Sequence, residues 1–193
     1  MKKIFLILLS LSLLLVFAAC GEEAVGPDGQ PVAEQPLVSL PEYALSLEEL
    51  PAEYDAALAK EDGCVIFENG DVSSGQELWD SFLAHTKAEK AATIRLAEYD
   101  AEAAAPRLIR DLHFDGKAYT LRSLQEDGSV QEISYPYLSR YEGDEIAPGM
   151  PYEPFIRYAL VEKKVSWSKL FEGFGQPGKE AAISFEIVYT DLL

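Results

Sequence analysis

The side chains best suited to nucleophilic or acid–base chemistry in this chain are one thiol and two imidazoles, those of Cys64, His85 and His113. A thiolate can attack an electrophilic carbon when a neighbouring histidine takes its proton. No sequence context ties either histidine to Cys64, and this thiol opens an apolar run, Cys64–Phe67, that is typical of a buried strand. We therefore predict a core thiol, and a thiol enzyme or envelope hydrolase that uses Cys64 is only the third functional hypothesis.

Asp111 and His113 lie two residues apart in a predicted strand and therefore share one of its faces. Such a pair can exchange a proton, but on a strand it is more often a pair of solvated neighbours. The sequence also lacks Gly-x-Ser-x-Gly, His-Glu-x-x-His, a phosphate-binding glycine loop and the paired cysteines of a metal site. Two acidic clusters, Glu126-Asp127 and Glu142, Asp144 and Glu145, lack the ligand spacing of a calcium loop. We predict no catalytic residue, no metal and no cofactor.

The densest aromatic segment lies between Tyr135 and Tyr158 and flanks a Pro-Gly loop. Aromatic side chains in this setting can form a platform for sugar rings or for a partner protein, because they offer a large contact area at low entropic cost. They are also ordinary strand residues that fill a core. Both interpretations stay open, and the candidate binding residues are Tyr141, Tyr152 and Tyr158.

Cys20 is predicted to be modified with lipid. It follows Lys2 and Lys3, an apolar run and Ala18-Ala19, which is the pattern of a bacterial lipoprotein signal. The apolar run is shorter than the roughly 20 residues that a membrane-spanning helix needs. Two acyl chains on the thiol would hold the protein at the extracytoplasmic face of the cell membrane. Cys64 would then have no disulfide partner.

Charge excludes one class of partner. The whole chain carries a formal charge of −17, and removal of residues 1–19, which contain two lysines and no acid, changes it to −19. Phosphate backbones and anionic headgroups repel such a chain, so we predict no nucleic-acid partner and membrane contact only through the lipid. Residues 20–42 are acidic and rich in proline and glycine, which is typical of a disordered tether, and residues 43–193 suit a single domain.

The first half of this domain is predicted to contain two helices around a short strand. Ser46–Glu49 is a capping-box pattern that would open a helix reaching Lys60, and Asp62-Gly63 would end it. Residues 64–67 form a strand and residues 68–71 a turn. A second capping box, Ser74–Glu77, opens a helix whose apolar residues recur at helical spacing and indicate a core face: Leu78, Trp79, Phe82 and Leu83.

The remaining elements are mostly strands, at residues 92–99, 107–114, 130–137, 155–161 and 182–190, with a short helix at 166–171. Asp115-Gly116 predicts a two-residue hairpin with Leu112 opposite Tyr119 and Arg110 opposite Leu121. The other face would be polar and wet, and it would carry Asp111, His113, Thr120 and Arg122. We predict an α+β fold, an antiparallel meander of about five or six strands with two or three helices packed on one side.

Five segments carry a resemblance to a known group: 61–65, 69–79, 140–143, 157–161 and 188–192. Together they resemble small, uncharacterised lipoproteins of Gram-positive bacteria that carry a domain of unknown function. The likeness covers most of the chain after Tyr43. It implies a cell-surface lipoprotein and carries over no catalytic or binding residue.

Three functions follow as hypotheses. The first is a non-catalytic domain, anchored to the membrane, that binds a ligand or partner at the cell envelope, with an envelope protein or a glycan as the partner. The second is an accessory or inhibitory subunit of an envelope complex. The third is the enzyme that would use Cys64.

Overall fold

The computed structural model describes residues 37–100, 105–145, 152–172 and 183–193. Residues Leu37–Leu193 form one compact unit, which begins before the predicted domain start at Tyr43. Cys20, with the rest of residues 1–36, lies outside the described residues, and so do residues 146–151, which include most of the predicted Pro-Gly loop at 147–154.

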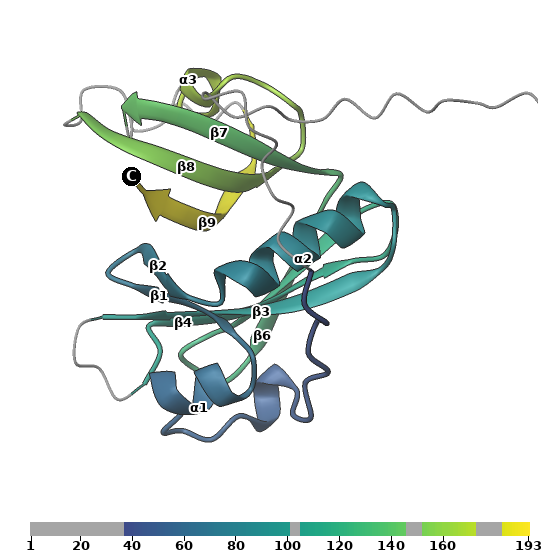
Figure 1. Ribbon diagram of the computed structural model, residues 1–193, viewed down its shortest axis with the longest axis vertical. Helices are drawn as coiled ribbons and strands as arrows, with labels where there is room; N and C mark the ends of the chain where they lie inside the picture. The colour runs from purple at the N-terminus through teal and green to yellow at the C-terminus, as the bar shows by residue number, and fades with distance from the viewer. Residues whose placement is uncertain (1–36, 101–104, 146–151, 173–182) are drawn as a thin grey trace, which may run out of the picture. The chain divides into compact units, whose positions relative to one another are not determined.

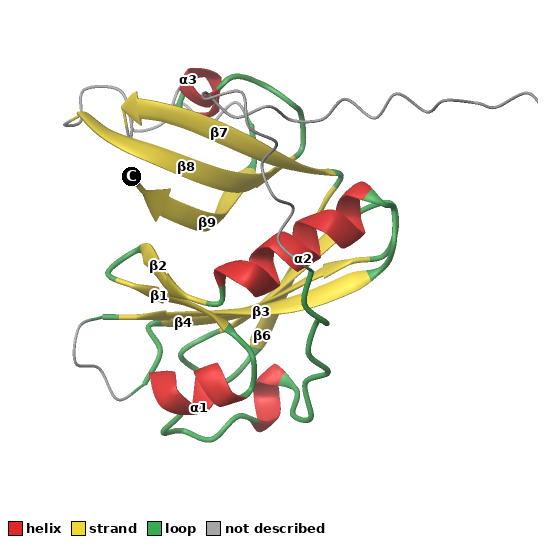
Figure 2. Ribbon diagram, in the orientation of Figure 1, coloured by secondary structure: helices red, strands yellow, loops and turns green. Residues whose placement is uncertain are grey.

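Strands dominate the described residues, and they form two sheets (Figure 2). The larger sheet contains β1 Val65–Glu68, β2 Asp71–Ser74, β3 Ala92–Tyr99, β4 Leu108–Phe114, β5 Tyr119–Leu124 and β6 Val130–Tyr135. The smaller sheet contains β7 Tyr137–Glu145, β8 Tyr152–Val161 and β9 Phe185–Leu192. The helices are a 3-10 turn, η1 Leu47–Glu49, and three α-helices, α1 Ala56–Glu61, α2 Gln76–Lys87 and α3 Trp167–Leu170.

The fold is α+β, but the predicted antiparallel meander is wrong in one respect. The larger sheet has the order β2-β1-β3-β4-β5-β6, and β1 runs parallel to β3. The remaining pairs are antiparallel, and β7-β8-β9 form a separate antiparallel sheet. The parallel pair arises because α2 carries the chain back across the sheet after the β1–β2 hairpin, as a crossover connection must.

The β4–β5 hairpin corrects the predicted register. Leu112 lies opposite Leu121, and Arg110 lies opposite Ser123. The carboxylate of Asp115 accepts hydrogen bonds from the backbone N–H groups of Lys117 and Ala118, both at 2.8 Å, and this stabilises a longer loop than the predicted two residues. The shift is two residues, so every side chain keeps its predicted face.

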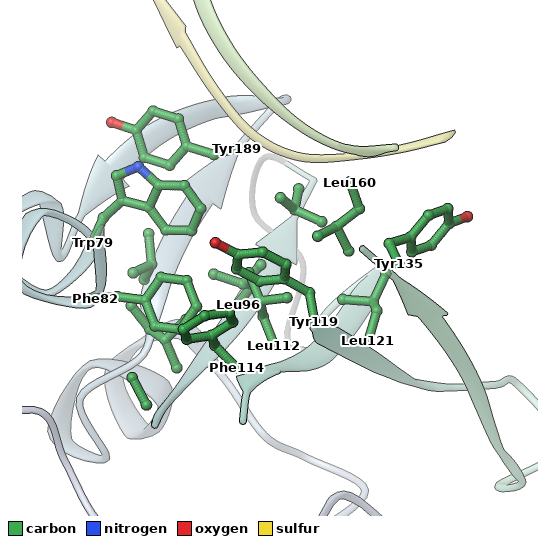
Figure 3. Close-up of a cluster of buried hydrophobic side chains, with 14 of the residues drawn as sticks. Trp79, Phe82, Leu96, Leu112, Phe114, Tyr119, Leu121, Tyr135, Leu160 and Tyr189 are labelled. Atoms are coloured by element: carbon green, nitrogen blue, oxygen red, sulfur yellow. The ribbon is translucent and has the colours of Figure 1, made fainter. Parts of the chain in front are cut away.

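One face of the larger sheet packs against α2 and the smaller sheet (Figures 1 and 3). Trp79 and Phe82 of α2 are buried there, which confirms the apolar helix face read from the sequence. Leu160 of β8 and Tyr189 of β9 belong to the same cluster, so the smaller sheet also packs against the side of α2 that carries Trp79. A single apolar cluster therefore joins α2 to both sheets.

The opposite face of the larger sheet is also covered, contrary to the predicted wet face and to helices on one side only. Leu47 of η1 and Ala59 of α1 pack with Ile66, Ala97 and other buried residues of β1, β3 and β4. The predicted alternation of side chains between the two faces is correct. The polar face is nevertheless covered, because the segment before β1 folds over the polar side chains of β3 and β4. A third cluster packs α3 against the outer face of the smaller sheet.

The two capping boxes behave differently from their predicted roles. The Ser46–Glu49 box forms, with the Glu49 carboxylate 3.0 Å from the Ser46 backbone nitrogen, but it opens only one 3-10 turn. Leu50 precedes Pro51 and is extended, because a residue before proline is forced out of the helical region. The helix α1 begins instead at Asp55, whose carboxylate accepts a hydrogen bond from the Leu58 backbone N–H at 2.9 Å.

Gly75, and not Ser74, precedes α2, and no side chain caps this helix end. Its φ is +84°, and a Cβ at this position would lie 2.8 Å from the carbonyl oxygen of Cys64 and 3.0 Å from Cα of Val65. The close approach is to backbone atoms of β1, which cannot rotate away. Gly75 thus sets the angle at which α2 leaves the hairpin.

Gly75→Ala is expected to lower the free energy of unfolding by about 2–4 kcal/mol, because backbone strain and a steric clash add together. Gly128→Ala is the matched control: its φ is +80°, but nothing lies within 4 Å of its Cβ position. Gly128→Ala should lower the free energy of unfolding by only about 1–2 kcal/mol, which is the effect of backbone strain without a steric clash. Urea denaturation measures both, and equal losses would show that the contact with β1 is unimportant.

Candidate functional site

An open groove of about 880 Å³ lies along the segment that precedes η1. We call residues 37–46 the strap and this cavity the strap groove. The strap lines one side of it. The rest of the lining comes from the end of α2, the start of β3 and the polar face of β4: His85, Ala91, Ala92, Thr93, Arg95, Asp111 and His113.

A buried ion pair supports the floor of the strap groove. Arg95 and Asp111 are directly opposite in the β3–β4 register, and they are only 1% and 8% exposed. Nε of Arg95 lies 2.7 Å from Oδ1 of Asp111, and Nη2 lies 3.0 Å from Oδ2. Burial lowers the pKa of Arg95, but the hydrogen bonds and the charge of Asp111 outweigh this effect and leave that pKa raised.

The same arginine holds the strap in place. Its Nη2 donates to the carbonyl oxygen of Leu45 at 3.0 Å, and its guanidinium lies 4.5 Å from the ring centroid of Tyr43. The Arg95 backbone N–H donates to the Tyr43 hydroxyl at 2.7 Å, just before β1 begins to pair with β3. That hydroxyl donates in turn to the carbonyl of Gly63, and burial raises the pKa of Tyr43. The strap is therefore an integral part of the domain.

Two half-buried imidazoles line the strap groove, and both are oriented through Nδ1. Nδ1 of His85 lies 2.8 Å from the carbonyl oxygen of Ser81, one helical turn earlier. A carbonyl only accepts, so this Nδ1 carries the hydrogen and the neutral ring has its lone pair on Nε2. Nδ1 of His113 lies 2.8 Å from Oγ1 of Thr93, its partner across β3 and β4.

The sequence did not predict that both histidines would line one cavity. His85 stands at the end of α2, and His113 lies on β4, so only the packing of α2 over β3 and β4 brings them to the same groove. Asp111 and His113 share a face as predicted, but they do not form an acid–base pair. Asp111 directs both oxygens to Arg95, while His113 contacts Thr93.

The strap groove combines hydrogen-bonding groups with apolar surface. The imidazoles and the Thr93 hydroxyl supply polar contacts, and the half-exposed side chains of Leu37 and Leu45 supply apolar ones. Within the part of the chain that the structure describes, no three side chains of histidine, cysteine, aspartate or glutamate are grouped as a metal site would require. This lining suits a compact polar ligand that has an apolar part. A lining of apolar surface with a few polar groups is typical of small-molecule sites.

Cys64 is not part of the strap groove lining. It is 1% exposed, which confirms the predicted core thiol. Its Sγ lies 3.4 Å from the Tyr54 hydroxyl, which in turn donates to Asp62 at 2.7 Å. Burial raises the pKa of Cys64 to about 11, the opposite of the lowered pKa that activates a nucleophilic thiol.

Cys64 is expected to resist alkylation in the folded protein, because its thiol is buried and protonated at neutral pH. The test is labelling by iodoacetamide at pH 7.5 in a Cys20→Ser chain, with the guanidinium-unfolded chain as the control. Labelling of the native chain should be slower by a factor of about 100 or more, given a thiolate fraction set by a pKa near 11. Equal rates would contradict the buried thiol.

The same thiol gives a pH dependence. Its pKa is about 11 when folded and 9.0 when unperturbed, so the folded state keeps a proton that the unfolded state releases. Its contribution to stability is therefore fully present below pH 9 and is lost as the pH rises from 9 to 11. Cys64→Ala should show a shallower alkaline loss of stability than the parent chain.

The predicted tyrosine platform is divided between two environments. Tyr141 pairs with Arg157, and Arg140 pairs with Tyr158, so Tyr141 and Tyr158 point to opposite faces of the smaller sheet. Tyr141 is buried in the cluster that contains α3. Tyr158 packs edge-on against Trp79, with ring centroids 5.2 Å apart. The side chain of Tyr152 lies outside the described residues. The structure does not bring Tyr141 and Tyr158 together, and a binding role for the three tyrosines stays a prediction.

Comparison of the chain with protein-family models, with curated proteins and with solved structures found no match. The resemblance to Gram-positive lipoproteins therefore stays a prediction from the sequence. Among the described residues, every helix is too short or too polar to cross a bilayer.

Proposed function

We propose that this chain is a lipid-anchored domain at the extracytoplasmic face of the cell membrane, and that it binds a small polar ligand in the strap groove without chemical conversion. The observation that carries the proposal is the groove itself, in which two half-buried imidazoles and Thr93 lie beside exposed apolar side chains. The buried, protonated state of Cys64 supports a non-catalytic role.

The rigidity of the groove floor also supports binding. Arg95, Asp111 and Tyr43 fix the strap against β3 through hydrogen bonds and stacking, so the lining is held in place before a ligand arrives. A site that is already ordered loses less entropy on binding than a mobile one. The strap also includes residues 37–42, the last part of the predicted tether, so ligand binding and membrane anchoring would involve neighbouring parts of the chain.

Mass spectrometry of the protein recovered from bacterial membranes tests the anchor. The mature chain should begin at Cys20 and carry the mass of a diacylglyceryl group, and Cys20→Ala should release the protein from the membrane. An unmodified or different N-terminus would contradict the lipid anchor, and it would leave the binding proposal untouched.

Ligand-observed NMR with a library of amino acids, dipeptides and small sugars tests binding. A binder should lose at least about tenfold in affinity in a His85→Phe/Thr93→Val variant, because buried polar groups of the ligand would be left without partners. Thr120→Val is the matched control, since Thr120 lies on the same face of the sheet but outside the groove lining. Equal losses in both variants would count against the strap groove.

An accessory or inhibitory subunit is the second candidate function. It would place part of a partner protein in the strap groove in place of a small ligand. Affinity purification of the lipidated chain from membranes distinguishes the two, because a stoichiometric protein partner supports the subunit.

A further inference from the structure

A second groove also lies at the C-terminal end of α2, the end that contributes His85 to the strap groove. Its lining comes from the C-terminal end of this helix, the β4–β5 turn, the start of β7 and the segment after β8, and its volume is about 530 Å³. Phe114 and Tyr119 form its floor, with ring centroids 4.6 Å apart. None of its lining residues belongs to the strap groove.

Three lysines surround this cavity, which we call the lysine groove. Lys87, Lys117 and Lys164 come from three separate elements, and all three are exposed. Glu89 is the one carboxylate among the lining residues. Within the described part of the chain none of the three lysines forms an ion pair, although Lys164 lies 5.0 Å from the ring centroid of Tyr137.

This arrangement runs against the composition of the chain. Carboxylates outnumber cations by 33 to 16, so an exposed lysine has many acids with which it could pair. Four arginines form ion pairs with carboxylates, Arg95, Arg107, Arg122 and Arg140, whereas Lys169 is the one lysine of the described residues that does so, and what distinguishes these three lysines is that they surround one cavity. Three unpaired lysines around one cavity therefore form a local positive site on an acidic protein.

We propose that the lysine groove binds an anionic glycan, a short run of sugar rings that carry carboxylate, sulfate or phosphate groups. Its volume lies in the range of ligand sites, and Tyr137, 39% exposed at the rim, offers an apolar ring surface for a sugar. Lysine ammonium groups are mobile point charges, so they suit anionic groups at irregular spacing. The site is concave, which favours a narrow chain over a flat bilayer.

The net negative charge of the protein does not prevent this binding. At physiological ionic strength charges are screened over about 8 Å, so an anion inside the groove responds mainly to the surrounding lysines. For the same reason, the affinity for an anionic glycan should fall as the salt concentration rises. This site is additional to the ligand site proposed for the strap groove and does not depend on it.

Isothermal titration of the full chain in detergent micelles tests the proposal, with trigalacturonate and a heparin-derived tetrasaccharide as probes and maltotriose as the neutral control. Both anionic probes should bind, with affinity that falls as sodium chloride is raised from 50 to 300 mM by a factor of about 10, and maltotriose should not. A Lys87→Gln/Lys117→Gln/Lys164→Gln variant should lose affinity at least about tenfold. Tyr137→Ala should also weaken both probes.

The matched control is Lys60→Gln/Lys90→Gln/Lys163→Gln, which makes the same change in net charge with exposed lysines outside the groove. It should keep its affinity within about twofold. Equal losses in the two triple variants, or no binding of either anionic probe by the folded chain, would overturn the proposal. Binding to phosphatidylglycerol vesicles through the same lysines, without binding of either oligosaccharide, would overturn it in favour of a membrane contact. Variants of the strap groove should leave all these affinities unchanged.

Discussion

Replacement of Arg95 by methionine is expected to lower the free energy of unfolding by about 3–5 kcal/mol, because it leaves the Asp111 carboxylate buried without a counter-charge. The variant also loses the hydrogen bond to Leu45 and the contact with the Tyr43 ring, so the strap should loosen. Urea denaturation followed by circular dichroism measures the stability. Hydrogen exchange of strap amides measures the loosening.

Two controls separate the buried charge from a general effect of losing an arginine. Arg107→Gln removes an arginine that is itself exposed and that pairs with the half-buried Glu98, and it should lower the free energy of unfolding by at most about 1 kcal/mol. The double variant Arg95→Met/Asp111→Leu removes both charges and should recover most of the loss, to within about 2 kcal/mol of the parent. If the double variant were as unstable as Arg95→Met, the isolated carboxylate would not be the cause.

Trp79→Ala is expected to lower the free energy of unfolding by about 3–5 kcal/mol. This would be the largest loss from truncating any single core residue in this chain. The indole is 1% exposed and stacks on Tyr189 of β9 with ring centroids 4.6 Å apart and planes 12° apart (Figure 3). It also contacts Phe82 and Tyr158, at 5.7 and 5.2 Å between centroids. Its removal would open a cavity between α2 and the smaller sheet, and thermal and urea unfolding would both register the loss.

Trp79→Phe is the informative companion variant. It keeps an aromatic ring at this position and removes an indole N–H that is buried without a hydrogen-bond partner among the described residues. Trp79→Phe should therefore lower the free energy of unfolding by only about 1–2 kcal/mol, since it reduces the volume of the side chain but breaks no hydrogen bond. A loss as large as that of Trp79→Ala would indicate that the N–H has a partner after all.

The sequence predicted which residues lie in strands and which way their side chains point more reliably than it predicted how the strands are paired. The alternation on β4 and β5 placed Asp111 with Arg122 and His113 with Thr120 on one face, as the structure shows. The hairpin register was two residues out, because the Asp115 side chain stabilises a longer loop. A shift of two residues leaves each side chain on the same face of the sheet, whereas the register of the strand pair depends on the length of the loop.

Long-range features had no local signal. The parallel pairing of β1 with β3 depends on how α2 crosses the sheet, and the burial of Arg95 depends on a strap that lies about 50 residues earlier in the sequence. The strap groove was missed for the same reason, because His85 and His113 meet only through tertiary packing. A signal was present in Arg95, a charged residue inside the apolar strand Ala92–Tyr99, which implies a buried partner.

A backbone amide NMR titration of the full chain with the tightest binder from the small-molecule library tests whether the strap groove is the ligand-binding site. If the ligand binds in the strap groove, chemical-shift changes should be concentrated in the strap, at Ala91–Arg95 and at Asp111–His113, with changes in the side-chain resonances of both histidines. Shifts confined to other surfaces of the domain, with these segments unaffected, would contradict it.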